Sequence, residues 1–110
     1  MYKIFAYWGA PKPEDVDAFE EHYLNVHCPI AASVPGIRRL ILTRAEGFEG
    51  ADGLHYRVAE LGWDSKEALD ECEQSEEWAA LRADAGQMVE RFGVTLENEM
   101  GEEVNALVAR

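Results

Sequence analysis

The stretch HYLNVHCP at residues 22–29, followed by the dipeptide Pro35-Gly36, decides the fold of this chain. Apolar side chains recur through it and the residues before it at helical spacing, at Val16, Phe19, Tyr23, Val26 and Ile30. We expect a helix that begins near Pro13, since proline suits the first turn and acidic residues follow it. Pro29 should break or kink that helix, because it lacks an N–H and its ring clashes with the preceding turn. Pro35-Gly36 predicts a turn.

His27 lies on the apolar side of this predicted helix. At about 100° per residue, Tyr23 and His27 fall roughly 20° to either side of Val16. His22 falls about 120° away from Val16, so we expect it to face solvent. The two histidines therefore do not form a metal pair, for which i, i+4 spacing is natural on a helix, and no metal site is predicted.

Two roles for His27 remain open from its position. Its unperturbed pKa near 6.5 suits a general acid or base, with Tyr23 orienting the ring or donating to a substrate oxygen. The alternative is a hydrogen-bonded core histidine that caps a carbonyl group freed by Pro29. The candidate catalytic residues are thus His27 and Tyr23.

The remaining elements give the topology. Alternating and apolar runs predict strands at residues 2–8, 37–45, 54–63 and 94–100. A second helical region follows Asp64, which has capping-box spacing to Glu67, and continues from a cap at Ser75 to a stop at Gly93. The order β-α-β-β-α-β predicts an α+β, ferredoxin-like fold with a four-stranded antiparallel sheet. A chain of 110 residues allows one domain, residues 1–110.

One face of this sheet has no cover within the chain. The first strand carries large apolar groups on both faces, and two helices can cover only one face of a sheet. A second copy is the simplest cover, so we expect a two-fold homodimer. Two sheets that close face to face would enclose a space in which a small ligand could bind.

Five further residues are candidate substrate-binding groups: Trp8, Arg39, His55, Tyr56 and Trp63. His55 and Tyr56 are adjacent on the third strand and must face opposite sides, so one of them should face the cavity. Trp8 and Trp63 are either core residues or cavity walls. Arg39, with its neighbours on the second strand, is able to neutralise acidic groups in the cavity.

Composition narrows the classes of partner. The net charge of −12 disfavours nucleic acid and anionic membranes, which would repel the surface. No apolar run approaches the roughly 20 residues that span a bilayer, and the first eight residues are too short and aromatic for a signal peptide. Cys28 and Cys72 lack CxxC spacing and are predicted to be free thiols in a reducing compartment. We therefore expect a cytoplasmic protein, and without nucleotide, zinc or serine-hydrolase motifs no cofactor is predicted.

The run from His22 to Ala31 and the following Val34-Pro35-Gly36-Ile37 resemble the EthD family, named for a protein of ethyl tert-butyl ether degradation. The HxP…PG pattern is moderately specific, and the similarity covers most of the chain. The resemblance implies a dimeric α+β barrel. It also implies that His27 faces the cavity, as the histidine of the motif. Relatives of this kind include cofactor-free lactone isomerases, polyketide cyclases and small monooxygenases.

Three functions follow as alternatives. The first is a cofactor-independent enzyme that moves a proton next to a carbonyl group of a small cyclic, aromatic or polyketide-like compound. The second is a small monooxygenase or oxidoreductase of the related barrel type, acting on an oxidisable substrate or using haem. The third is a non-catalytic accessory protein of a catabolic, ether-degradation-like system, which binds a hydrophobic metabolite without converting it.

Overall fold

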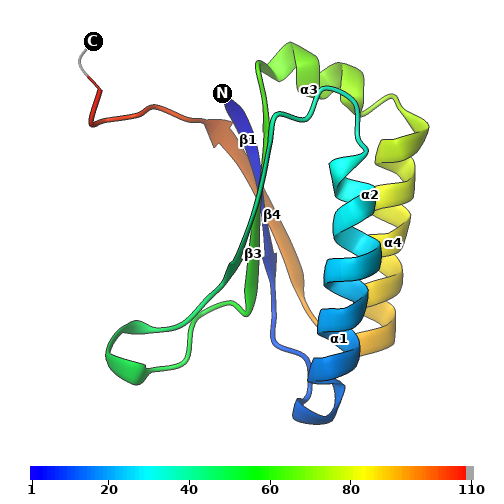
Figure 1. Ribbon diagram of the computed structural model, residues 1–110, viewed down its shortest axis with the longest axis vertical. Coiled ribbons are helices and arrows are strands. Elements are labelled where there is room, and N and C mark those ends of the chain that lie inside the picture. Colours follow the sequence, from blue (N-terminus) through cyan, green and yellow to red (C-terminus); the bar gives the residue numbers. More distant parts are fainter. Residues whose placement is uncertain (109–110) are drawn as a thin grey trace.

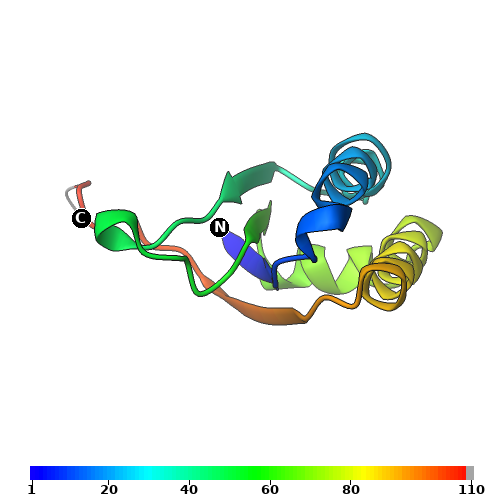
Figure 2. The ribbon, with the colours of Figure 1, turned by 90° about the horizontal axis from the view of Figure 1, so that it is seen from below.

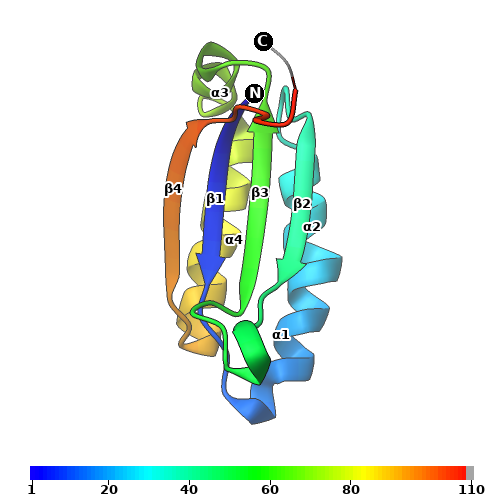
Figure 3. The same ribbon diagram turned by 90° about the vertical axis from the view of Figure 1, so that its left-hand side faces the viewer.

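The computed structural model describes residues 1–108 and shows a four-stranded antiparallel sheet with helices on one face (Figure 1). The strands are β1 (Tyr2–Trp8), β2 (Arg39–Arg44), β3 (Arg57–Trp63) and β4 (Leu96–Glu102). Their order across the sheet is β2-β3-β1-β4, which Figure 3 shows face on. This arrangement confirms the predicted β-α-β-β-α-β fold class. The assignment of residues 1–110 to one domain stays a prediction, and residues 109–110 lie outside the described residues.

The helical path of the HYLNVHCP stretch differs from the expected one. A 3-10 turn, η1 (Pro13–Asp15), leads into α1 (Val16–His22), then a π-helical turn, η2 (Tyr23–His27), and α2 (Cys28–Ala32). Pro29 was expected to break or kink the helix, but helical backbone continues through it. Because Pro29 has no N–H to give the preceding turn, that turn widens to i→i+5 bonding, with the Cys28 N–H donating to the Tyr23 carbonyl.

The second helical region consists of α3 (Lys66–Cys72) and α4 (Glu76–Phe92). Ser65, and not Asp64, caps α3: its hydroxyl accepts the Ala68 N–H at 3.1 Å, while its backbone is extended. The predicted cap at Ser75 is confirmed, since its hydroxyl accepts the Trp78 N–H at 3.1 Å. Gly93 ends α4 in the left-handed region with φ of 64°, as predicted.

The third strand begins at Arg57 and not at residue 54, which changes where His55 and Tyr56 lie. Strand alternation carried back to residue 54 would put Tyr56 on the same face as Val58. Instead Tyr56 packs edge-on against Phe19 of α1, with ring centroids 5.6 Å apart. His55 lies against Tyr7 of β1 at 4.7 Å. The alternation fails because both residues precede the regular strand.

The core lies between the sheet and the helices, which Figure 2 shows on one side of the sheet only. One cluster surrounds Ile4, Leu61 and Trp63, and a second surrounds Trp8 and Phe19. The opposite, outer face of the sheet has no helical cover within residues 1–108. No helix in that range is both apolar enough and long enough to cross a membrane.

Two extensions project beyond this outer face (Figure 1). They are the connection between β2 and β3 and the segment that follows β4. Each carries exposed apolar side chains, at Phe48 and Leu54 in the first and at Leu107 in the second. Apolar groups left in water at the rim of an uncovered sheet are typical of a surface that meets a partner.

Candidate active site

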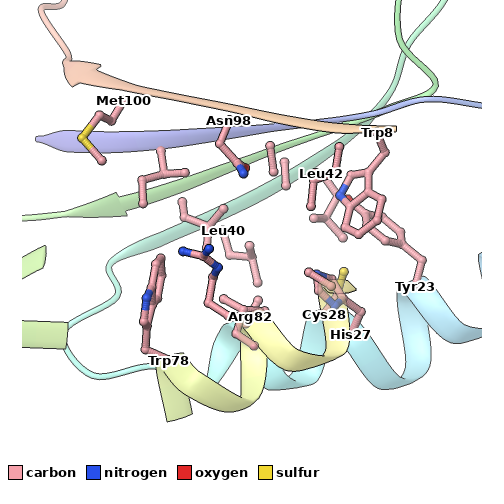
Figure 4. A pocket seen from close by; sticks show the side chains of 18 of the residues that line it. Trp8, Tyr23, His27, Cys28, Leu40, Leu42, Trp78, Arg82, Asn98 and Met100 are labelled. Atoms are coloured by element: carbon pink, nitrogen blue, oxygen red, sulfur yellow. The ribbon is translucent and has the colours of Figure 1, made fainter. Parts of the chain in front are cut away.

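A cavity of about 200 Å³ lies between the sheet and the helices (Figure 4). Its walls are largely aliphatic and come from all four strands and from α2 and α4, and include Ile4, Ala6, Ala31, Leu40, Leu42, Ala59, Leu61, Leu81 and Ala85. We had expected the cavity to lie on the other side of the sheet, between two subunits. The cavity that His27 reaches is inside one chain, because the apolar stripe of the first helix covers the inner face of the sheet.

His27 forms a buried dyad with Asp84 of α4. The His27 Nδ1 and Asp84 Oδ2 atoms are 2.7 Å apart, and each residue is 8% exposed. A carboxylate only accepts hydrogen bonds, so Nδ1 carries the proton and Nε2 of the neutral ring keeps its lone pair. The ring lines the cavity. Its Nε2 is therefore the basic atom that this side chain can offer to a ligand.

Burial favours this basic form. Removal of the His27 ring from water lowers its pKa below the usual value, although the hydrogen bond that Nδ1–H donates to Asp84 acts in the opposite direction. A lowered pKa leaves the imidazole neutral near pH 7. A neutral imidazole held by a carboxylate is the arrangement of a general base.

His22 also reaches Asp84, contrary to the expectation that it faces solvent. Its Nε2 atom lies 2.9 Å from Oδ1 and 3.1 Å from Oδ2 of the carboxylate. Residues five apart on an α-helix point about 140° away from each other, but the wider i→i+5 turn reduces this angle and places them on the same side. The π-helical turn between His22 and His27 therefore turns both rings toward one carboxylate.

Asp84 is the site residue that the sequence analysis missed. It lies three residues after Leu81 and four before Met88, both of which are buried on the inner stripe of α4. A carboxylate on an apolar helix stripe needs a partner once it is buried. The place of Asp84 on the apolar stripe is therefore the sequence signal that indicates a buried carboxylate with a partner.

Tyr23 lines the cavity next to His27 with a hydroxyl that lacks a partner. Its side chain is fully buried, and no protein atom of residues 1–108 accepts or donates a hydrogen bond at the hydroxyl. The Tyr23 and His27 rings stack with centroids 6.0 Å apart, and Trp8 meets His27 edge-on at 5.3 Å. Burial raises the pKa of Tyr23, so the hydroxyl stays protonated and can donate. The hydroxyl is thus an unpaired donor next to the dyad.

Cys28 also lines the cavity, next to the dyad. Burial raises the pKa of its thiol to about 11, which keeps it protonated at neutral pH. A thiol in this state is a weak nucleophile, so the geometry gives Cys28 a packing role.

The structure brings together three of the seven predicted site residues, since His27, Tyr23 and Trp8 line the cavity. Tyr56 and Trp63 are buried in the core on the same side of the sheet without lining the cavity. His55 and Arg39 lie on the outer face, where Arg39 pairs with Glu103 at 2.7 Å.

Two polar side chains lie along the cavity between His27 and Trp78. Arg82 of α4 and Asn98 of β4 extend toward each other from opposite walls (Figure 4). The ion pairs within residues 1–108 use Arg38, Arg39 and Arg57 but not Arg82. The guanidinium is thus available to an oxygen of a ligand, although the carboxylates Glu73 and Glu99 also lie along this rim. In the same range, no three His, Cys, Asp or Glu residues are grouped to hold a metal ion.

Comparisons with known proteins agree with this fold. The sequence model of a family described as "Antibiotic biosynthesis monooxygenase" matches residues 1–84. An EthD family protein from Bacillus halodurans is 32% identical, with a TM-score of 0.81 over 94% of this chain and 99% of its own. A putative antibiotic biosynthesis monooxygenase from Deinococcus radiodurans is 13% identical, with a TM-score of 0.67 over 100% of this chain and 99% of its own, and shows the fold alone. An uncharacterized 11.0 kDa protein from the thcB-thcC intergenic region of Rhodococcus erythropolis is 27% identical over 87% of this chain and 90% of its own length.

Proposed function

Because the chain belongs to the antibiotic biosynthesis monooxygenase family, in the dimeric α+β barrel superfamily, we propose that it is a cofactor-independent enzyme that removes a proton from a small cyclic compound. The observation that carries this proposal is the buried Asp84–His27 dyad, whose ring lines an apolar cavity.

The reaction uses three side chains. Nε2 of His27 takes a proton from a carbon next to a carbonyl group: the C–H bond breaks, its electron pair forms the enolate, and an N–H bond forms on the ring. Asp84 stabilises the imidazolium that results. The Tyr23 hydroxyl donates to the carbonyl oxygen as negative charge develops there, and the dry walls strengthen this interaction. Return of the proton to another carbon completes an isomerisation; in a cyclisation the enolate carbon instead attacks a second carbonyl carbon of the substrate, and the proton goes to the oxygen of that carbonyl group.

The cavity limits the size of the substrate. Pockets for drug-sized ligands are roughly 300–1,000 Å³, so about 200 Å³ fits a compound of one or two rings. Arg82 and Asn98 would bind a second oxygen of the substrate, while the aliphatic walls hold the rings. The substrate class is thus a small aromatic or polyketide-like ketone.

Oxygenation is a second candidate, favoured by the family match. The carbanion that His27 creates can react with molecular oxygen without a bound cofactor. A CH₂ group then becomes a carbonyl group, with one oxygen atom entering the product and the other leaving as water, so R₂CH₂ + O₂ gives R₂C=O + H₂O. Proton removal by His27 is the first step of both reactions.

Within this family we assign the chain to an EthD-like branch, on the 32% identity to the Bacillus halodurans protein and on the HxP…PG pattern. Proteins of the wider family are typically dimeric. We propose that a second copy covers the outer face, where Phe5, Tyr7 and the 47% exposed Ile41 leave apolar surface uncovered. We also keep the cytoplasmic location as a proposal, on the two free thiols.

Exchange of carbon-bound deuterium tests the proposal without knowledge of the natural substrate. We would follow loss of deuterium from the position between the ring and the carbonyl of 2-tetralone, a two-ring ketone, by proton NMR at pH 7.5. The protein should accelerate the loss, and His27→Gln should abolish the acceleration. His55→Gln is the matched variant, because that ring lies on the outer face. An equal loss of rate in both variants, or exchange unaffected by His27→Gln, would refute base catalysis in the cavity.

A further inference from the structure

The second histidine on Asp84 has no place in the proposed reaction. A dyad needs one imidazole and one carboxylate, yet the carboxylate of Asp84 receives Nε2 of His22 at 2.9 Å and 3.1 Å as well as Nδ1 of His27 at 2.7 Å. The His22 side chain is 19% exposed, and those of His27 and Asp84 are each 10% exposed. His22 therefore closes the site on the side away from the cavity.

We propose that His22 is a positioning residue, which fixes the Asp84 carboxylate so that His27 keeps its proton on Nδ1 and its lone pair toward the cavity. This inference rests on the proposed function, since it assigns His22 a part in the same base. The Nε2–H group of His22 points between the two carboxylate oxygens, which holds the plane of the carboxylate. Without this bond Asp84 would keep one hydrogen bond and could rotate away from His27.

The backbone supports this role independently of the side-chain distances. A π-helical turn is rare and recurs at functional sites. Here it occupies the residues that separate the two histidines, Tyr23–His27. An uninterrupted α-helix would leave His22 about 140° away from His27, beyond reach of the same carboxylate. The turn thus builds the shared contact.

The tautomer of His27 distinguishes the two roles of His22, because a purely structural His22 would leave that tautomer unchanged when it is replaced. In ¹⁵N-labelled protein at pH 7.5, two-bond proton–nitrogen correlation separates a protonated Nδ1 from a protonated Nε2. We expect Nδ1–H in the unaltered protein. His22→Leu should move a measurable part of His27 to the Nε2–H form and slow exchange of 2-tetralone by about tenfold, the loss of roughly one hydrogen bond.

A conservative replacement tests rescue. His22→Gln places an amide N–H near the former Nε2 position and should restore both the tautomer and the exchange rate to within about twofold. His22→Asn is polar but too short to reach, so it should behave like His22→Leu, and it serves if the leucine variant fails to fold. A His27 spectrum identical in the leucine, asparagine and unaltered proteins would overturn the positioning role.

Failure of the proposed function gives a different pattern. In one outcome, no variant accelerates deuterium loss from 2-tetralone, but the His27 tautomer changes with the residue at position 22. The positioning role then stands and the catalytic proposal fails. If exchange depends on His27 while the tautomer ignores position 22, the catalytic proposal stands and the positioning role is refuted.

Discussion

Replacement of Tyr23 by phenylalanine should stabilise the protein while it weakens the site. The hydroxyl is fully buried and has no partner in residues 1–108, and an unsatisfied buried hydroxyl costs about 1–3 kcal/mol. Phenylalanine keeps the ring that stacks on Phe19 at 5.7 Å and on His27 at 6.0 Å. We therefore expect Tyr23→Phe to raise the free energy of unfolding by about 1–2 kcal/mol. For a domain of this size that corresponds to a rise in Tm of about 4–8 °C.

Urea unfolding at pH 7.5, followed by circular dichroism, measures this change, and thermal unfolding gives the Tm. Tyr2→Phe is the matched control, because that half-buried tyrosine lies at the edge of the core and should change stability by less than about 0.5 kcal/mol. The same Tyr23 variant should exchange 2-tetralone at least about tenfold more slowly, since it cannot donate to the developing oxyanion. A Tyr23→Phe protein that is less stable than its parent would show that the hydroxyl is already satisfied and would refute the argument.

Three further predictions concern the dyad and the outer face. Asp84→Asn should slow exchange by about 10²–10⁴-fold, because an amide N–H can turn the His27 tautomer around; an unchanged rate would remove Asp84 from the site. The pKa of His27 is lowered on folding, so the unfolded chain binds more protons below about pH 6.5. The stability from the neutral ring is therefore complete above that pH and is lost as pH falls further, through the lowered pKa of the folded protein. Unfolding measured between pH 7.5 and 5 should thus show a weaker pH dependence in His27→Gln than in the parent, and equal slopes would contradict the lowered pKa. Ile41→Asp on the outer face should convert a dimer to a monomer in sedimentation equilibrium at micromolar concentration, whereas a monomeric parent protein would refute the dimer.

The topology was predictable because each of its signals is local. Strand alternation at residues 2–8, the cap at Ser75 and the glycine stop at Gly93 all act within a few residues and are confirmed. Errors occurred where two local signals competed. Asp64 and Ser65 are both good caps, and only the extended backbone at Ser65 decided between them.

The site was predictable only in part. A helical wheel assumes the same number of residues per turn along the whole helix, and this helix contains a wider turn. His27 and Tyr23 were found by their place on the apolar stripe, and both line the cavity. His22 was assigned to solvent, since the wheel has no means to describe a turn that Pro29 widens. Asp84 is 57 residues away from His27 in sequence, so no local pattern joins them.

The sequence also did not predict which side of the sheet carries the cavity. Both faces of β1 bear large apolar groups, and pattern alone does not say which face the helices take. The cavity that His27 lines is on the inner face, whereas His55 and Arg39 lie on the outer face, where their predicted roles stay predictions. In β3, side-chain alternation predicts the face of each residue from Arg57 onward, but it does not predict the faces of the two residues before the strand.

The most direct test of the central claim is the ¹⁵N spectrum of His27 at pH 7.5 with and without 2-naphthol, an aromatic analogue of the enol of 2-tetralone. The account predicts a neutral ring with the proton on Nδ1, and an Nε2 resonance that shifts when 2-naphthol binds beside the ring. A ring protonated on Nε2, or an Nε2 resonance that bound 2-naphthol leaves unmoved, would contradict the account.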